Sequence, residues 1–226
     1  MTTKKRILTA ALCMFAAFVC TAPAGAEFIT IGITGEVDIA YEWDGFLGGA
    51  VQKGDIMTGA YTYDTSTPDS QRGPRDGQYL YHSPPFGIEL KVGRLEFRTD
   101  PDNVNFRILM RNDYWRAGSD APEDYVFIRS VNNLLSPIEV PIDHEIWLML
   151  IGDSGAISCD ALPATSPVLS DWSTASVTIL RPSKPNQAQQ FLIQGYWTDA
   201  FVIPEPATLA LLGLGALALL RKRGRI

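Results

Sequence analysis

Residues 86–92 read Phe86-Gly-Ile-Glu-Leu-Lys-Val92, where Phe86, Ile88, Leu90 and Val92 alternate with glycine or charged residues. This period of two is typical of a β-strand with one buried and one exposed face. The same alternation recurs along the chain, at 29–33, 57–63, 104–108, 125–128, 177–179 and 191–193. No sustained helical period interrupts it between residues 27 and 203, so the sequence predicts an all-β domain.

Polar segments rich in proline, glycine, aspartate and serine separate these stretches, at 64–74, 99–103, 118–122, 152–155 and 181–186. Such residues form turns and loops. The continuous apolar run Ile146–Ile151 predicts a central strand that is covered on both faces. Residues 132–141 are expected to form a long crossing loop. About ten strands with these breaks predict an antiparallel β-sandwich of jelly-roll type over residues 27–203.

The first 26 residues have the pattern of a signal peptide. Lys4, Lys5 and Arg6 precede an apolar run from Ile7 to Cys20, and small residues follow it. The run is too short to span a bilayer comfortably, since a spanning helix needs about 20 apolar residues. Ala24 and Ala26 stand where a signal peptidase requires small side chains, so cleavage is expected after Ala26.

The last residues form a second short apolar segment with a basic end. Pro204-Glu205-Pro206 precedes the apolar stretch 207–220. A helix over that stretch is about 21 Å long, against a hydrocarbon core of about 30 Å. Four basic residues follow it: Arg221, Lys222, Arg223 and Arg225. Such a cluster stays on the cytoplasmic side, so the segment is expected to act as a short transmembrane helix with the β-domain outside.

The tripeptide, apolar segment and basic end together resemble the PEP-CTERM sorting signal of exported proteins in Gram-negative bacteria that make exopolysaccharide. The resemblance implies recognition by an exosortase-like membrane protease and cleavage near Pro204-Glu205-Pro206. It divides the chain into a signal peptide (1–26), a β-domain (27–203) and a sorting tail (204–226). It also implies localisation at the cell envelope or outer surface, or secretion, and a role in the extracellular matrix or biofilm.

A second resemblance lies inside the predicted domain. Residues 54–64, Gly54-Asp-Ile-Met-Thr-Gly-Ala-Tyr-Thr-Tyr-Asp64, look like a segment common in PEP-CTERM exported domains. Those domains are presumed to be β-sandwiches, so this resemblance implies a fold and no reaction.

The charge distribution excludes one class of partner. The chain has 19 basic and 25 acidic residues, a net charge of −6. Seven of the basic residues and one of the acidic residues lie in the two ends. The middle therefore keeps 12 basic and 24 acidic residues, a net charge of −12. A nucleic-acid-binding protein needs a basic surface, so no nucleic-acid partner is expected.

The cysteine content bears on cofactors and metals. Cys13 and Cys20 lie in the signal peptide, which leaves Cys159 as the one cysteine of the mature domain. No disulfide within the mature domain and no cysteine-ligated zinc site can form. We expect Cys159 to be a small buried apolar residue. No cofactor or metal site is expected.

Residues Gly152-Asp153-Ser154-Gly155 resemble the nucleophile loop of chymotrypsin-like proteases, and His82 and Asp102 precede them in the family's order. The resemblance ends after four residues. Ala156-Ile157 follows instead of Gly-Pro, and His82 lies in a different context. We interpret the four residues as a hairpin turn after the strand that ends at Ile151.

Two other chemistries are weighed from carboxylate spacing. Glu89 and Glu96 could serve a jelly-roll hydrolase together with His144 or Ser154, but seven residues of unbroken strand place the two glutamates on opposite faces unless Gly93 bends the strand. Calcium could bind loop carboxylates. The candidates are Asp64, Asp69, Asp76, Asp100, Asp102 and Asn103.

Aromatic side chains are the remaining indication of a ligand. Rings with one polar edge suit the faces of sugars. The candidates for a stacking platform are Tyr79, Tyr81, Tyr114, Trp115, Trp172, Tyr196 and Trp197. The sequence therefore predicts a non-enzymatic exported β-domain, with exopolysaccharide binding as one alternative and a hydrolase as another.

Overall fold

The computed structural model describes residues 28–43, 45–71, 73, 75–116, 118–137, 140–181 and 191–204. The predicted signal peptide and the sorting tail after Pro204 lie outside these residues. Within them the chain forms twelve strands and one 3₁₀ turn, η1 (Leu169–Asp171). No helix in this part of the chain is long and apolar enough to cross a membrane.

The strands are β1 (Phe28–Glu42), β2 (Ile56–Asp64), β3 (Asp76–Tyr81), β4 (Gly87–Val92), β5 (Leu95–Thr99), β6 (Asn105–Tyr114), β7 (Glu123–Val131), β8 (Asn133–Ser136), β9 (Val140–Ile142), β10 (Glu145–Asp153), β11 (Thr174–Leu180) and β12 (Phe191–Ile203). All the strand pairs are antiparallel. The prediction of an antiparallel all-β domain is confirmed.

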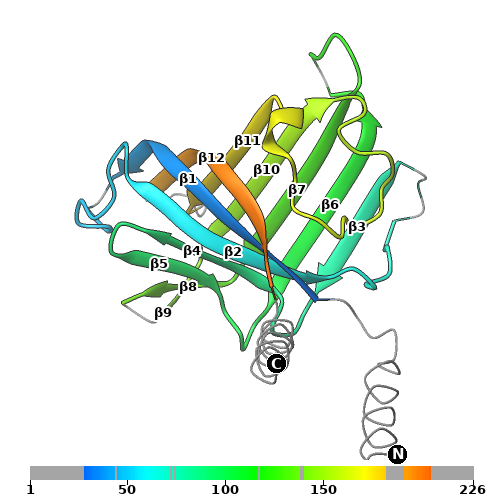
Figure 1. Ribbon diagram of the computed structural model, residues 1–226. Coiled ribbons are helices and arrows are strands. Elements are labelled where there is room, and N and C mark those ends of the chain that lie inside the picture. The colour runs from blue at the N-terminus through cyan, green and yellow to red at the C-terminus, as the bar shows by residue number, and fades with distance from the viewer. Residues whose placement is uncertain are drawn as a thin grey trace, which may run out of the picture.

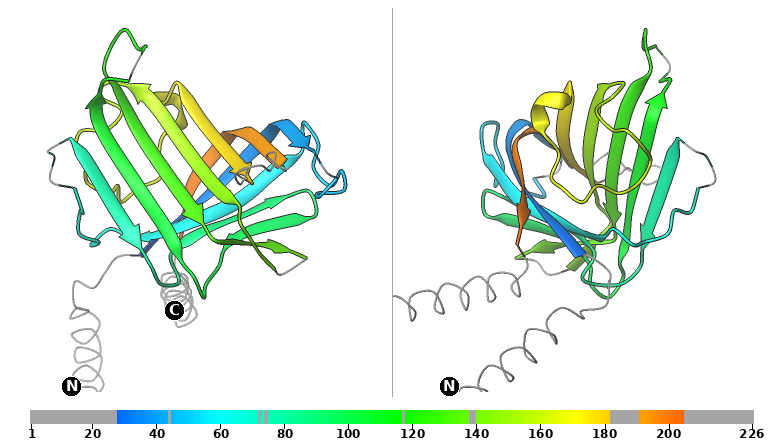
Figure 2. Two further views of the ribbon diagram at one scale, coloured as in Figure 1. Left: turned by 180° about the vertical axis from the view of Figure 1, so that it is seen from behind. Right: turned by 45° about the vertical axis from the view of Figure 1, so that its right-hand side comes forward.

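The twelve strands form one sheet instead of the two separate sheets of a sandwich. Its order is β3-β6-β7-β10-β11-β12-β1-β2-β4-β5-β8-β9. The sheet curls into a half-barrel, so its two halves face each other (Figures 1 and 2). We call β3-β6-β7-β10-β11 the first wall and β1-β2-β4-β5-β8-β9 the second wall. The last strand, β12, pairs with β11 on one side and β1 on the other and thereby joins the walls.

The predicted alternation decides which side chains enter the core between the walls. Ile88, Leu90 and Val92 are buried, while Glu89 and Lys91 on the same strand are exposed. Ring contacts cross the core, as between Phe97 of β5 in the second wall and Phe191 at the start of the joining strand β12, whose centroids are 6.2 Å apart. Burying one such apolar side chain stabilises the fold by about 1.5–3 kcal/mol.

Two local predictions are wrong. Residues 132–141 contain the strands β8 and β9, which extend the second wall at its edge, and do not form a long loop. The run Ile146–Ile151 is a central strand between β7 and β11, but only its inner face is fully covered. Trp147 and Met149 point to the outer face and are half-buried.

A long loop, residues 154–173, covers the interior of the half-barrel. The Tyr63 hydroxyl donates a hydrogen bond to the Pro163 carbonyl (2.7 Å), and the Tyr79 hydroxyl donates one to the Asp160 carbonyl (2.8 Å). Burial raises the pKa of both phenols, that of Tyr79 to about 12. The tyrosines of β2 and β3 therefore fasten the loop to the sheet.

Candidate functional site

The outer face of the first wall carries a row of half-buried aromatic and charged side chains. On β7, Val126 and Ile128 enter the core, so Tyr125, Phe127 and Arg129 point outward. Strand pairing continues this row sideways, because Arg129 lies opposite Trp147 of β10 and opposite Arg107 of β6. We call Arg107, Tyr125, Phe127, Arg129, Glu145 and Trp147 the outer row.

The three rings of the outer row are in contact. The ring centroids of Tyr125 and Phe127 are 6.0 Å apart, and the two ring planes are nearly parallel. The Trp147 ring meets the Phe127 ring edge-on, with a centroid distance of 5.7 Å. Aromatic pairs at these distances stabilise each other beyond their buried area. The rings form a continuous, partly exposed surface across two neighbouring strands.

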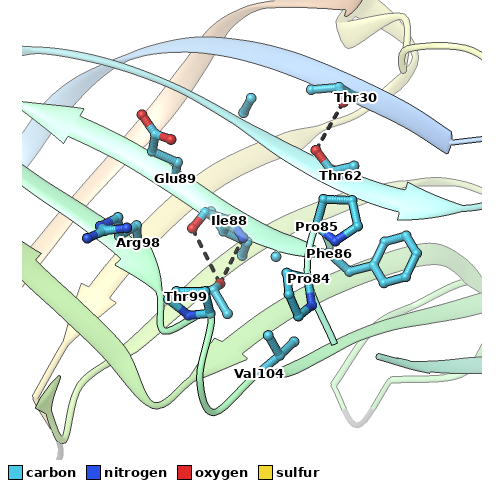
Figure 3. A pocket seen from close by; sticks show the side chains of 13 residues that line it. Thr30, Thr62, Pro84, Pro85, Phe86, Ile88, Glu89, Arg98, Thr99 and Val104 are labelled. Atoms are coloured by element: carbon cyan, nitrogen blue, oxygen red, sulfur yellow. Dashed lines mark hydrogen bonds between the residues drawn. The ribbon is translucent and has the colours of Figure 1, made fainter. Parts of the chain in front are cut away.

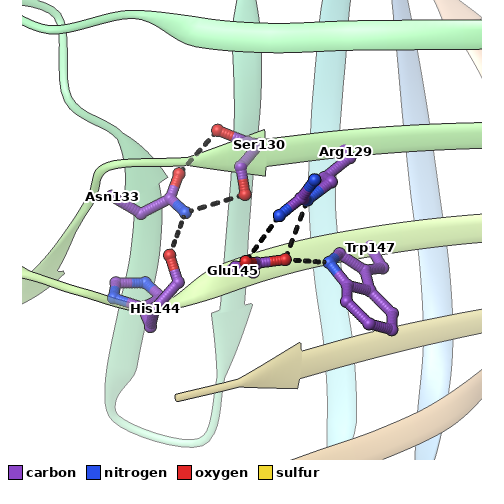
Figure 4. A network of polar contacts seen from close by, with 6 residues as sticks. All are labelled: Arg129, Ser130, Asn133, His144, Glu145 and Trp147. Atoms are coloured by element: carbon purple, nitrogen blue, oxygen red, sulfur yellow. Dashed lines mark hydrogen bonds and ion pairs between the residues drawn. The ribbon is translucent and has the colours of Figure 1, made fainter. Parts of the chain in front are cut away.

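An ion pair fixes the orientation of Trp147 (Figure 4). Arg129 donates two hydrogen bonds to Glu145, of 2.8 and 2.6 Å, and the Trp147 indole N–H donates to the same carboxylate at 2.6 Å. The side chains of Arg129 and Glu145 are 29% and 15% exposed. Bidentate, partly buried pairs of this kind are stronger than ordinary surface pairs. The indole is therefore held against the sheet in a single orientation.

Arg107 has no bidentate ion pair of the kind that Arg129 makes, among the residues that the structure describes. It lies directly opposite Arg129, and its guanidinium carbon is 6.0 Å from the centre of the Phe127 ring. Burial and the neighbouring Arg129 lower its pKa. Its Nε is buried and has no hydrogen-bond partner among the described residues. A buried donor without a partner is costly, so the Arg107 side chain is less well compensated than that of Arg129.

The predicted aromatic platform is largely a different set of rings. Tyr79, Tyr81 and Trp197 are buried in the core, and Trp172 is half-buried against it. Tyr114, Trp115 and Tyr196 are exposed, but Tyr196 lies on β12 and the other two at the end of β6. The alternation at 125–128 already predicts that Tyr125 and Phe127 share a face. The sequence does not show which face is exposed, so the outer row was missed.

His144 lies in a buried polar cluster inside the half-barrel. Its backbone carbonyl accepts a hydrogen bond from the Asn133 side chain (2.8 Å), which also contacts Ser130 (Figure 4). Ser130 is in turn 2.7 Å from the Thr99 hydroxyl. The cluster joins β5, β7, β8 and the start of β10 across the walls. His144 is 1% exposed, so a substrate in solvent does not reach it.

The protease-like residues form a structural loop. The Ser154 hydroxyl donates to Asp113, and His82 is exposed in the loop before β4. Asp124, which is fully buried, accepts hydrogen bonds from the backbone N–H groups of Asp113, Gly155 and Ile157 at 2.8–2.9 Å. The sequence gives no signal for this carboxylate, which holds the start of the 154–173 loop. A turn is present as predicted, but the chain then enters that loop instead of a hairpin.

Glu89 and Glu96 lie on the same face, because Gly93 ends β4 and the chain reverses into β5. Gly93 has a φ of +59°, and a Cβ there would lie 2.7 Å from the Ala50 carbonyl oxygen. Lys91 is 3.5 Å from Glu89 and 3.4 Å from Glu96. The two glutamates therefore flank a lysine on an exposed hairpin, and Ser154 and His144 have partners elsewhere.

The predicted calcium ligands have local partners. Asp64 and Asp69 accept hydrogen bonds from the backbone of their own loop, Asp100 does so from Asp102, and Asp76 pairs with Arg111 at 3.2 Å. Within the described ranges, no group of three or more His, Cys, Asp or Glu residues is placed to hold a metal ion. Cys159 is exposed in the 154–173 loop, so the prediction that it is buried is wrong.

A model of the PEP-CTERM protein-sorting motif matches residues 202–224. The match includes Pro204, Glu205 and Pro206 and the first three residues of the basic end, and it begins inside β12. No curated protein and no solved structure matches the chain significantly. The chain therefore ends in a PEP-CTERM protein-sorting motif, the mark of an exported protein that an exosortase, a membrane protease, sorts to the cell envelope or surface.

Proposed function

We propose that the β-domain is a non-catalytic binding module that holds exopolysaccharide on its outer row once the chain has been exported and processed. The observation that carries this proposal is the contact of Tyr125, Phe127 and Trp147 on one outer face, beside the guanidinium of Arg107. Partly exposed rings offer apolar faces to the C–H groups of sugars, while an arginine donates hydrogen bonds to their oxygens.

The overall charge favours one kind of polysaccharide. The domain has a net charge of −12, so a densely anionic polymer is repelled at long range. Arg107 and Arg129 supply positive charge on the outer row itself, and Glu145 balances one of them. A neutral or sparsely carboxylated chain therefore suits this surface better than a polyuronate.

Affinity electrophoresis tests the binding. The protein is run in native gels that contain hydroxyethyl cellulose, xanthan or alginate, and its mobility is compared with that in a plain gel. We expect retardation by the first two and less by alginate. Trp147→Ala should weaken the binding about fivefold, since one stacked ring contributes on the order of 1 kcal/mol.

Trp115→Ala is the matched control, because Trp115 is 63% exposed and does not belong to the outer row. This variant should bind as the wild type does. Equal loss in both variants, or no retardation in any gel, would exclude the outer row as a polysaccharide site.

The sorting steps form the second part of the proposal. The signal peptide is removed after Ala26, and the exosortase cleaves near Pro204, so the tail anchors the chain only transiently. The intact mass of the protein from envelope and medium of its native host tests this. A mass that includes residues 207–226 in both fractions would mean a permanent anchor and contradict cleavage. Excess mass would indicate attached glycan.

The hydrolase alternative has less support. Its candidates Glu89 and Glu96 contact Lys91 on an exposed hairpin, Ser154 contacts Asp113, and His144 is enclosed in the core. Release of reducing ends from the retarding polysaccharide, lost in Glu89→Gln and Glu96→Gln, would favour this alternative over binding alone.

A further inference from the structure

The end of β12 carries exposed apolar side chains next to the start of β1. Phe28, Phe201 and Ile203 are 40%, 46% and 38% exposed, and we call these three residues the basal patch. Antiparallel pairing brings them together, since Thr30 lies opposite Ile203 and Gly32 opposite Phe201. A Cβ at Gly32 would lie 2.6 Å from the Phe201 ring, so this glycine lets the ring lie flat on the sheet.

A hollow of about 350 Å³ in the second wall extends this apolar surface (Figure 3). Small and apolar residues dominate its lining, among them Thr30, Ala60, Thr62, Pro84, Pro85 and Phe86. The Phe86 ring meets Phe28 edge-on at 5.3 Å, which makes the hollow continuous with the basal patch. The charged residues of the lining are Glu89 and Arg98.

The chain length between this surface and the sorting tail is very short. Only Pro204, Glu205 and Pro206 separate Ile203 from the apolar stretch 207–220. Four extended Cα steps cover about 14 Å. The headgroup layer on each side of a bilayer is about 5–8 Å thick. With Ala207 at the edge of the hydrocarbon core, Ile203 therefore lies within the headgroups or a few ångströms above them.

We propose that the basal patch binds the headgroup region of the membrane that holds the tail, and so orients the domain before the exosortase releases it. This inference rests on insertion of the tail, which the sorting motif requires. The patch places aromatic and aliphatic side chains where amphipathic surfaces bind membrane interfaces. β12 pairs with β11 only up to Tyr196, so the edge of residues 197–203 away from β1 has no ladder partner in the pairings of the described strands. Such an edge requires the hydrated interface, since unpaired backbone groups are excluded from hydrocarbon.

This orientation turns the outer row away from the lipid. The basal patch lies on β1 and β12, and the outer row lies on the far side of the half-barrel, on β6, β7 and β10 (Figures 1 and 2). A polysaccharide outside the membrane would therefore reach the outer row while the tail is still inserted.

Fluorescence quenching in vesicles tests the proposal. The full chain is produced in a Gram-negative host without an exosortase, with Cys159→Ser to remove the exposed thiol. An environment-sensitive dye is attached to Phe201→Cys or, as the matched control, to Ile39→Cys. Ile39 is 42% exposed and lies near the other end of β1. The vesicles contain phosphatidylethanolamine and phosphatidylglycerol, with nitroxide-labelled lipids near the headgroup or deep in the acyl chains.

We expect the shallow nitroxide to lower the fluorescence at position 201 by about threefold and the deep one to lower it less, because interfacial burial reaches about 5–10 Å. The dye at position 39 should not respond. Ile203→Cys gives a second reading on the same face if Phe201→Cys folds poorly, as circular dichroism would show. Flotation with the vesicles measures insertion of the tail separately.

The other outcomes overturn the proposal in distinguishable ways. A chain that floats but is quenched at neither position 201 nor 203 has an inserted tail and no lipid contact at the patch. A chain that does not float contradicts tail insertion as well. A dye response in detergent that grows with protein concentration, without quenching in vesicles, assigns the patch to a second copy of the chain.

Discussion

The two walls of the half-barrel share one core but differ on their outer faces. The outer row of the first wall combines rings with arginines, and a glutamate holds one arginine and one indole in place. The basal patch, on β1 and β12, consists of three apolar side chains without a charge among them. Rings beside fixed hydrogen-bond donors suit a polar ligand, whereas bare apolar side chains suit a lipid interface. One sheet thus carries two chemically different surfaces.

A change in the shared interior should destroy both surfaces at once and has the largest expected effect. Asp124→Ala leaves three backbone N–H groups without their acceptor, those of Asp113, Gly155 and Ile157. We expect the free energy of unfolding to fall by about 3 kcal/mol or more, as measured by urea denaturation. Glu123→Ala is the neighbouring control. Its exposed pair with Arg116 should be worth less than about 1 kcal/mol, so similar losses in the two variants would contradict the role of Asp124.

Alkaline pH should weaken the interior through the buried phenol of Tyr79, and the outer row carries a phenol of its own, Tyr125, whose pKa is also raised by burial. The folded state raises the pKa of Tyr79 from 10.0 to about 12, mainly through burial. The unfolded chain therefore loses this proton first, so the contribution is complete below about pH 10 and is lost as the pH approaches 12. Between about pH 9 and pH 11, the free energy of unfolding from urea denaturation should fall less in Tyr79→Phe than in the wild type. If the free energy of unfolding falls equally in Tyr79→Phe and the wild type, Tyr79 is not a source of the alkaline loss of stability. Tyr41→Phe, at an exposed residue, serves as the control.

Arg107→Gln tests the outer row alone. It removes a cation that faces Arg129 and keeps part of the side-chain volume. Retardation by xanthan should fall about threefold, because a charge-assisted hydrogen bond to the ligand is lost. Stability should stay equal or rise slightly, since like charges opposite each other destabilise a sheet. Arg94→Gln, on the exposed turn after β4, should change neither the retardation by xanthan nor the stability. An equal loss of retardation in that variant would indicate a general charge effect.

Phe201→Ser tests the basal patch alone and has the smallest expected effect. The inserted tail still holds the full chain to vesicles, so flotation should change by about twofold at most. Quenching of a dye at Ile203→Cys by shallow nitroxide lipids should fall clearly, and retardation by xanthan should not change. A variant that loses xanthan binding as well would show that the two surfaces are not independent.

The strands that alternate clearly could be predicted from the sequence, because one buried face imposes a period of two wherever a strand is long enough. β8 and β9 have only four and three residues, Pro137 follows β8 and Pro141 lies within β9, so they carry no such period. β1 was recognised only at its start, since register shifts after Thr34 and Val37 break the alternation. Periodicity describes the faces of one strand and not its neighbours, which is why two sheets were expected where one is present.

The sites show the same limit. The sorting motif is a linear signal, so it could be recognised from the tail sequence alone, and the match to residues 202–224 confirms it. The outer row depends on which strands pair, because Arg107, Arg129 and Trp147 meet only through β6, β7 and β10. Asp124 resembles any other aspartate in the sequence. Its importance appears only when the 154–173 loop returns to its carboxylate.

The position of β12 between the two walls also determines when the sheet can close during export. Until residues 191–203 emerge from the translocation channel, β11 and β1 each lack one of their two neighbours, and the half-barrel consists of two unjoined pieces. Exposed strand edges of that kind are prone to aggregation, and pairing between distant parts of a chain is slow. The sorting tail follows β12 at once, so its arrest in the membrane coincides with the first moment at which the sheet can close. The arrested tail would then give the domain time to fold near the membrane, and the exosortase would release a folded domain instead of a partly folded one.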